Sequence, residues 1–334
     1  MILERELKRI MEQNALITYA YSRYINHTPR FINADMVEDL ARDCECSKHD
    51  SYLLLLSAAM GLDTVDDPEH RLLERLYIKS GVRALDPTDY QKDAYYQAVK
   101  LPSHVHGRWE TLTATYTAYE PFVWRDPIVQ KDLREIPQIG YFENDFHFPA
   151  IHQDGVEWMS VKPNEVETMK EPIQNSHGRV LTLGLGLGYF AFHASQKEEV
   201  SSVTVVERDM EVIELFKRLI LPQFPHKEKI EIVCADAIEF MEKELPGRSF
   251  DTVFADLWHD ASDGLELYLK LRRLERNAKG ARVDYWIECS LLSALRHLIY
   301  EKICDSAITL PLGTKSGSEI LTNDFLRTLS LDFS

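Results

Sequence analysis

The spacing of apolar residues changes along the chain, and the changes divide it into three predicted parts. Residues 1–125 carry apolar side chains at intervals of three and four, which is typical of amphipathic helices. Residues 126–165 contain short β-forming runs between prolines, with a hairpin turn signal at Asp154-Gly155. In residues 166–334, apolar strands alternate with amphipathic helices, which is typical of a parallel sheet covered by helices. We therefore predict an α/β fold with a helical N-terminal domain, a small antiparallel β element between the two domains, and a Rossmann-like, mostly parallel sheet.

Two segments outside the predicted sheet bear on the site. A helix is predicted for residues 86–100, and its aromatic residues are interpreted as helix core, with the lining of a substrate pocket as the alternative: Tyr90, Tyr95 and Tyr96. Near the C-terminus, residues 307–312 and 326–333 could supply a closing β hairpin to the sheet.

A glycine-rich turn lies at the centre of the α/β part. Residues 180–183 form an apolar strand, and Gly184, Gly186 and Gly188 follow at alternate positions before an apolar helix begins. Glycine permits the backbone angles of a tight strand-to-helix turn and lets a ligand approach the main chain closely. The following helix would direct its free N–H groups and positive dipole end at that ligand. The turn predicts a nucleoside-cofactor site, and a turn that binds nothing is the alternative.

The next three strands end in acidic residues. Glu207 closes the strand after the glycine helix, where a carboxylate can bind both hydroxyls of a ribose. Asp236 and Ala237 follow the third strand, and Asp236 could also cap the helix that starts there. Asp256 ends the fourth strand. Ligands of open α/β sheets bind beyond the carboxyl ends of the strands, so Asp256 is expected to face the cofactor pocket.

The glycine spacing separates two classes of cofactor site. The dinucleotide fingerprint is G-x-G-x-x-G, and Tyr189 stands where its third glycine would be. The G-x-G-x-G pattern resembles the first motif of class I S-adenosylmethionine-dependent methyltransferases and of their relatives, the spermidine synthases. The resemblance covers about residues 166–289. It implies that S-adenosylmethionine, or its decarboxylated form, binds with its methionine part near the glycines and its adenine near Asp236 and Ala237.

The resemblance also implies where the chemistry lies. Asp256 would stand where the acceptor meets the sulfonium, and a carboxylate there could hold or deprotonate an amine. Asp260 and His259 follow in the same loop as further catalytic candidates, although a hydrogen-bonding surface role is the alternative for His259. Two departures stand out: Thr182 replaces an acidic residue found in many methyltransferases, and Asp256-Leu-Trp-His-Asp260 differs from the Asp-Ser-Ser-Asp-Pro run of spermidine synthases.

The segment before the glycine strand supplies candidates for a cover over the cofactor. In methyltransferases the corresponding segment often closes over the ligand, which makes four residues of this chain candidates: Trp158, Asn164, Glu165 and Thr168.

Composition narrows the functional classes. The net charge of −16 disfavours DNA or RNA as a substrate and is compatible with a cationic small molecule, although an ordinary acidic surface explains it equally well. The five cysteines are scattered, and Cys44, Cys46 and His49 lack the spacing of a zinc site, so neither a disulfide framework nor a metal is expected. No signal peptide or membrane-spanning run is recognisable, so we expect a cytoplasmic protein without a membrane partner; a homodimer is compatible with the sequence.

Three functions remain open from the sequence. The first is a methyltransferase that acts on a small-molecule acceptor. The second is a spermidine-synthase-like aminopropyltransferase that uses decarboxylated S-adenosylmethionine. The third is a non-catalytic cofactor-binding protein whose helical domain contacts other proteins.

Overall fold

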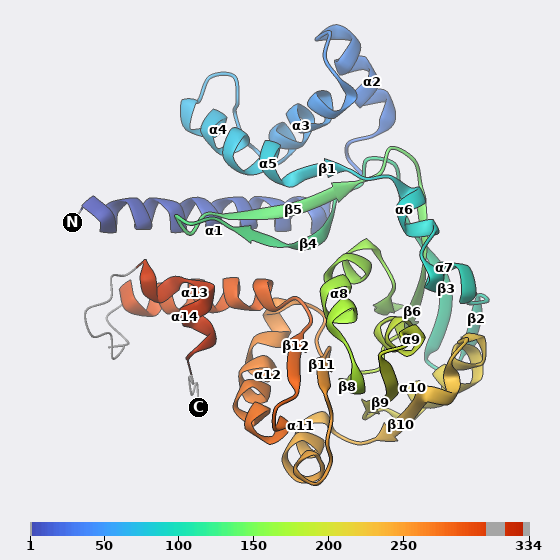
Figure 1. Cartoon of the computed structure of the whole chain (residues 1–334). Helices are drawn as coiled ribbons and strands as arrows, with labels where there is room; N and C mark the ends of the chain where they lie inside the picture. Colours follow the sequence, from blue (N-terminus) through green and yellow to red (C-terminus); the bar gives the residue numbers. More distant parts are fainter. Residues whose placement is uncertain (1, 305–317, 330–334) are drawn as a thin grey trace. The chain divides into compact units, whose positions relative to one another are not determined.

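The computed structural model describes residues 2–304 and 318–329 (Figure 1). The chain forms two compact units whose segments alternate along the sequence. The first unit contains residues 2–87, 115–146 and 292–304 with 318–329, and the second contains residues 88–114 and 147–291. Each unit therefore combines segments from all three parts of the predicted division.

The first unit consists of helices and a small sheet. Asn33 and Ser47 cap α2 and α3 by accepting hydrogen bonds from backbone N–H groups, and Asp67 with Pro68 begins α4 in the same way. The sheet has the order β1-β5-β4, with β1 parallel and β4 antiparallel to β5. The elements are α1 (Ile2–His27), α2 (Ala34–Asp43), α3 (Lys48–Ala59), α4 (Pro68–Leu73), the π-helix η1 (Glu74–Ile78), α5 (Lys79–Gly81), β1 (Val82–Ala84), β4 (Phe122–Val129) and β5 (Glu135–Tyr141).

A buried ion pair ties the C-terminal elements to this unit. Arg296 lies on α13 (Glu288–Cys304) and is fully buried, where its guanidinium donates to the Glu135 carboxylate at the start of β5. Its Nε also donates to the Leu321 carbonyl at 2.7 Å, in the 3-10 turn η7 (Glu319–Leu321) before α14 (Asn323–Arg327). A buried charge needs such partners, so this cluster fixes α13 and α14 against β5.

The second unit contains two sheets. The smaller one has the order β2-β3-β6-β7, and its strands are β2 (His104–His106), β3 (Trp109–Tyr116), β6 (Phe146–Gln153) and β7 (Val156–Ser160). The larger one has the order β10-β9-β8-β11-β12, and each neighbouring pair is parallel. Its strands are β8 (Gly178–Leu183), β9 (Val200–Glu207), β10 (Ile230–Cys234), β11 (Thr252–Ala255) and β12 (Arg282–Tyr285).

The strand order of the larger sheet indicates where along the sheet a ligand is expected to bind. The chain runs from β8 outward through β9 to β10, then returns to the other side of β8 with β11 and β12. The order therefore reverses between β8 and β11, and in open α/β sheets ligands bind at the carboxyl edge of such a point. The intervening helices are α8 (Pro163–Asn175), α9 (Tyr189–Gln196), α10 (Met210–Leu219), α11 (Ala237–Glu239) and α12 (Ala261–Leu274), with the shorter turns η2 (Leu221–Gln223), η3 (Lys227–Lys229), η4 (Phe240–Glu244), η5 (Leu245–Gly247) and η6 (Glu275–Ala278).

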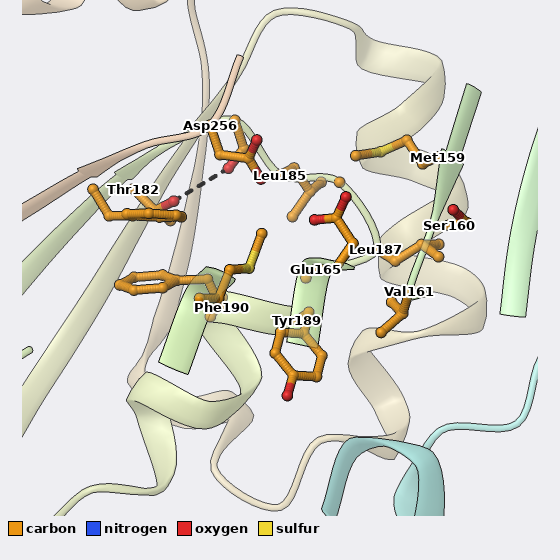
Figure 2. A pocket seen from close by; sticks show the side chains of 16 residues that line it. Met159, Ser160, Val161, Glu165, Thr182, Leu185, Leu187, Tyr189, Phe190 and Asp256 are labelled. Carbon is orange, nitrogen blue, oxygen red and sulfur yellow. Dashed lines mark hydrogen bonds between the residues drawn. The ribbon is translucent and has the colours of Figure 1, made fainter. Parts of the chain in front are cut away.

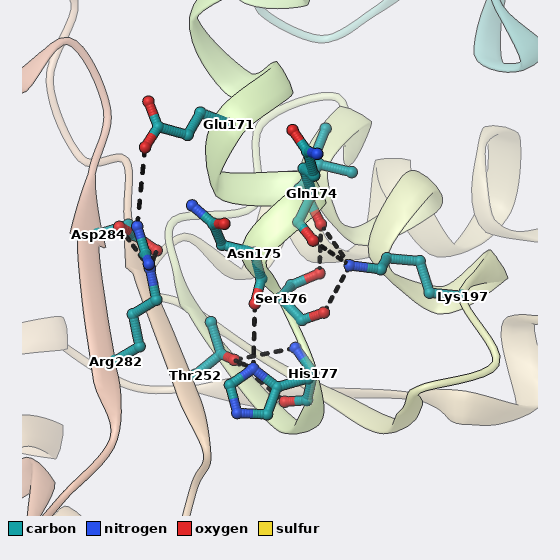
Figure 3. A network of polar contacts seen from close by, with 10 residues as sticks. Glu171, Gln174, Asn175, Ser176, His177, Lys197, Thr252, Arg282 and Asp284 are labelled. Carbon is teal, nitrogen blue, oxygen red and sulfur yellow. Dashed lines mark hydrogen bonds and ion pairs between the residues drawn. The ribbon is translucent and has the colours of Figure 1, made fainter.

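The C-terminal end of α8 is fixed by side-chain hydrogen bonds (Figure 3). Lys197, just after α9, donates from Nζ to the carbonyls of Ile173, Gln174 and Ser176 at 2.9, 2.6 and 2.6 Å. The last carbonyls of a helix have no partner within the helix, and this one ammonium group binds two of them, Ile173 O and Gln174 O, together with the carbonyl of the C-cap residue Ser176. In addition, the indole N–H of Trp286 donates to the Thr168 hydroxyl in the middle of α8 at 2.8 Å. The helix is thus held along its length against the sheet.

The predicted fold class is confirmed, and the structure corrects several details. Strands β2, β3 and the first half of β4 lie before residue 126, in the region predicted to be helical, so the β element is larger and forms two sheets. The helix predicted for residues 86–100 is broken into α6 (Pro87–Gln91) and α7 (Ala94–Ala98), because Asp93 starts the second helix as its N-cap. Of the closing hairpin, residues 307–312 lie outside the described residues, while Leu326 belongs to α14 rather than to a strand.

Candidate functional site

The glycine turn connects β8 to α9 with left-handed backbone angles. Gly184, Gly186 and Gly188 have φ values of 99°, 55° and 75°, a region that L side chains rarely adopt. A Cβ on Gly184 would lie 1.8 Å from the backbone oxygen of Asp256, and one on Gly186 would lie 2.5 Å from the Cε of Met159. The backbone angles disfavour side chains at all three positions, and at Gly184 the backbone at the end of β11 excludes one outright, whereas the flexible end of Met159 could move aside at Gly186.

Glu207 is held at the turn by backbone donors. Its carboxylate accepts hydrogen bonds from Leu185 N at 3.3 Å and from Asp209 N at 2.8 Å, and the turn itself is anchored by Gly184 N donating to Val206 O at 2.9 Å. A carboxylate that accepts from backbone N–H groups is fixed in direction while other lone pairs stay available. The end of β9 thus presents an oriented carboxylate beside the glycine turn.

A single cavity joins the ends of the strands. It has a volume of about 490 Å³, in the range of sites for small ligands, and lies within the second unit. Its lining includes Gly184, Gly186, Glu207, Asp236, Ala237, Asp256, His259 and Asp260. A narrow recess of about 20 Å³ continues along the turn to Gly188 and the start of α9 (Figure 2). The structure therefore brings every residue predicted from the strand ends, the glycine turn and the loop after β11 to one cavity and its recess.

Two carboxylates line both this cavity and its recess. Asp256 follows β11 and Glu165 lies in the first turn of α8, and Figure 2 shows both side chains at the same pocket. Burial raises the pKa of Asp256 from 3.8 to about 7. Burial, and then the negative charge of Asp256, raises the pKa of Glu165 well above its usual value. Because two nearby carboxylates resist simultaneous ionisation, this carboxylate pair, Asp256 and Glu165, holds a proton near neutral pH.

The cavity as a whole is acidic. Its lining carries the carboxylates of Glu157, Glu165, Glu207, Asp236, Asp256 and Asp260 against the basic side chains of Lys162, Arg208 and His259. The ammonium group of Lys162 forms an ion pair with Glu157 at 3.1 Å. A concave site lined mainly by one sign of charge concentrates ligands of the opposite sign, so this cavity favours a cationic ligand.

Three of the predicted site residues also form hydrogen bonds or contacts at the starts of helices. Asp236 caps α11 by accepting from Ile238 N and Glu239 N, so the capping alternative is observed together with its position at the cavity. Asp260 caps α12, and Asp263 completes the capping box. The ring of His259 contacts the Asp263 carboxylate at 3.0 Å from Nδ1. Asp260 and His259 are exposed at the rim, whereas Asp256 lies deeper.

The covering segment contributes two of its four candidates to the cavity. Trp158 and Glu165 line it, while Asn164 does not and Thr168 instead anchors Trp286. Sequence reasoning treated Glu165 only as part of a cover and did not foresee its coupling to Asp256. An acidic residue in the first turn of the helix before the glycine strand was the available signal, but only the folded chain shows which carboxylate it faces.

The described residues, 2–304 and 318–329, contain neither a metal site nor a membrane-spanning helix. Among them, no group of three or more His, Cys, Asp or Glu side chains is arranged to hold a metal ion. Within the same residues, none of the helices is both long and apolar enough to cross a bilayer.

Comparison with known proteins gives partial matches to solved structures. No family model and no curated protein sequence matches the chain. A spermidine synthase from Thermotoga maritima is 15% identical, with a TM-score of 0.33 over 44% of this chain and 55% of that one. A spermidine synthase in complex with the transition state analogue AdoDATO is 16% identical, with a TM-score of 0.34 over 44% and 57%. A precorrin 8W decarboxylase from Methanobacterium thermoautotrophicum is 17% identical, with a TM-score of 0.28 over 37% and 63%.

The matched stretches cover only 55% to 63% of those solved chains. At such low TM-scores, the fold is assigned from the chain's own strand order.

Proposed function

We propose that this protein is a transferase that binds S-adenosylmethionine and methylates a small cationic acceptor, an amine. The observation that carries the proposal is the single acidic cavity, which joins the glycine turn, the oriented carboxylate of Glu207 and the carboxylate pair. The cavity is large enough to hold the nucleoside part of a cofactor at the glycine turn and a cationic acceptor at the carboxylate pair.

The residues present fit such a cofactor. The glycine turn is a cradle that a Cβ would fill, and the N-terminus of α9 begins directly beyond it. Glu207 would bind the ribose hydroxyls, and Asp236 with Ala237 would bind the adenine. When bound, the cofactor supplies a carbon made electrophilic by a positively charged sulfur. The protein contributes binding, alignment and a site for the acceptor's proton.

The carboxylate pair has the properties required at the acceptor end. An amine nucleophile is protonated in water at neutral pH and must lose a proton before it can react. A carboxylate with a pKa near 7 accepts that proton more readily than an ordinary aspartate, since a catalytic group works best when its pKa lies near the operating pH. Before that step, the pair attracts the acceptor as an ammonium ion.

A second candidate is aminopropyl transfer from decarboxylated S-adenosylmethionine. Thr182 stands where many methyltransferases carry an acidic residue that spermidine synthases also tend to lack, and the cavity lining is acidic around Asp256 and Glu165. A cofactor tail that carries an amine without a carboxylate would suit this surface. The altered loop from Asp256 to Asp260 stands against this candidate. A non-catalytic cofactor binder is the third candidate, because Asp236 and Asp260 already serve as helix caps.

Calorimetric titration of the purified full-length protein separates these candidates. S-adenosylmethionine, its decarboxylated form and NAD would each be titrated, followed by a panel of amine acceptors with the donor that binds. We expect S-adenosylmethionine to bind and NAD not to bind. Preference for the decarboxylated form would replace methyl by aminopropyl transfer, and binding without turnover on any acceptor would leave a cofactor-binding protein. Binding of NAD alone, or of no nucleoside, would refute the proposal.

A further inference from the structure

Helix α7, which lies outside the parallel sheet, forms a hydrogen bond to the glycine turn. Tyr95 lies on α7 and is fully buried, and its hydroxyl donates to the carbonyl of Leu187 at 2.7 Å. Leu187 stands between the second and third glycines of the turn. The bond joins residues that are 92 positions apart in the sequence, so α7 reaches the turn only through the folded chain.

The peptide between Leu187 and Gly188 is thereby fixed on both sides. Its carbonyl accepts from Tyr95, while its N–H donates to Leu185 O at 2.9 Å. A peptide group is planar, so two such bonds define the plane that sets Gly188 at its φ of 75° and starts α9. The direction of the first N–H groups of α9, which the proposed cofactor would meet, depends on this plane.

Asp93 holds the start of α9 from the same side. Its carboxylate accepts from Tyr95 N at 2.8 Å and from the Tyr189 hydroxyl at 2.9 Å, and it contacts Nε2 of His193 at 3.1 Å. Figure 2 shows the ring of Tyr189 at the recess, with its hydroxyl directed away from the other lining side chains. One carboxylate thus joins the start of α7 to the first turn of α9.

Aromatic packing completes the contact. The ring of Tyr95 packs against the rings of Tyr189, Phe192 and Phe224, with centroid distances of 5.5, 5.3 and 6.3 Å. Packing of the ring would survive loss of the hydroxyl, since phenylalanine has the same ring. The hydroxyl and the ring can therefore be separated by experiment.

We propose that Tyr95 and Asp93 are positioning residues for the cofactor site, which set the geometry of the glycine turn without touching the ligand. The identity of the ligand rests on the proposed function, whereas the effect on the turn does not. In this account α7 belongs functionally to the cofactor site, although it ends 80 residues before β8, the strand that leads into the glycine turn.

The test compares two tyrosine-to-phenylalanine variants of the full-length protein. Tyr95→Phe removes the bond to Leu187. Tyr268 is a comparably buried tyrosine, and Tyr268→Phe removes its part-buried hydrogen bond to the Glu288 carboxylate at 2.8 Å, away from the turn. Amide hydrogen exchange is measured without ligand for residues 184–192, and the dissociation constant for S-adenosylmethionine is measured by calorimetry. Removing one partner of a buried hydrogen bond leaves the other unsatisfied, so we expect about tenfold faster exchange and about tenfold weaker binding for Tyr95→Phe alone.

The two measurements test different claims: hydrogen exchange tests the positioning role, and calorimetry tests the proposed function. Unchanged exchange of residues 184–192 in Tyr95→Phe would overturn the positioning role, whatever the protein binds. An equal change in both variants would also overturn it, because the effect would then be a general loss of stability. If the wild-type protein binds no S-adenosyl compound, the proposed function fails, while hydrogen exchange still decides the role of Tyr95. In a turnover assay, we expect KM for the cofactor to rise with kcat largely kept.

Discussion

Replacement of Asp256 by asparagine should stabilise the protein at alkaline pH while it abolishes turnover. The folded state raises the pKa of Asp256 from 3.8 to about 7, so between these values the folded protein binds more protons than the unfolded chain. Stability must therefore fall as the pH rises through that window. Asparagine has nearly the same shape and does not titrate, so the Asp256→Asn variant should lose this part of the pH dependence.

The size of the effect follows from the pKa values. One pKa unit corresponds to about 1.4 kcal/mol, so a shift from 3.8 to about 7 corresponds to about 4 kcal/mol at pH 8. The side chain keeps some contact with solvent in the open cavity, which screens charge, so we take about half of that value. We expect Asp256→Asn to be about 2 kcal/mol more stable than wild type at pH 8 and equal to it near pH 4.

The assay is urea unfolding of both proteins between pH 4 and pH 8, followed by circular dichroism. Asp251→Asn is a matched control, because Asp251 lies just before the other end of the same strand. The backbone N–H of Arg179 donates to it at 2.7 Å, and this bond lowers the pKa of Asp251. Its contribution to stability is present above the unfolded pKa and is lost as the pH falls through the folded value. The control should therefore be destabilised at pH 8. If Asp256→Asn were also destabilised there, the argument for a desolvated carboxylate would be refuted.

Three further predictions concern the cofactor end, the helix α8 and the acceptor. Glu207→Ala should weaken binding of S-adenosylmethionine about 100-fold in calorimetry, since two hydrogen bonds to a charged acceptor contribute roughly 1.5 kcal/mol or more each. The control variant Glu231→Ala, at an exposed position on the neighbouring strand, should bind S-adenosylmethionine as the wild type does. Equal affinities of the two variants would contradict the assignment of Glu207 to the site. Lys197→Met should destabilise the protein by about 2 kcal/mol in urea unfolding, because three carbonyls at the end of α8 each lose a hydrogen bond from a charged donor. Lys243→Met, which removes only an exposed ion pair, should change stability by less than about 0.5 kcal/mol. An amine acceptor should release protons when it binds near pH 7, because an ammonium ion favours ionisation of the carboxylate pair; calorimetry in buffers of different ionisation enthalpy measures this, and proton uptake would contradict it.

The parallel sheet and its site were predictable because their signals are local. A buried strand, a glycine turn and an acidic strand end each occupy a few consecutive residues, and parallel topology then brings Gly184, Glu207, Asp236 and Asp256 to one edge. The sequence pattern could not show what depends on distant partners. Strand β3 pairs with strands on both sides, and its own periodicity does not indicate these partners. The sequence around Tyr95 is compatible with both helix core and pocket lining, and only the folded chain shows its hydrogen bond to Leu187.

The cost of the carboxylate pair is itself an argument for function. A chain selected for stability alone would not keep Asp256 and Glu165 together in a desolvated pocket, because neutral residues of similar shape would avoid both burial of charge and repulsion. Around the pair, the structure is firmly supported: Lys197 and Trp286 fix the helix that carries Glu165, and the backbone N–H of Asp256 donates to Leu183 O at 2.8 Å. Surroundings that hold the two groups in place keep them ready for a positively charged ligand, which favours release of the pair's proton when it binds. The destabilised part of the cavity is therefore the part that should meet the acceptor.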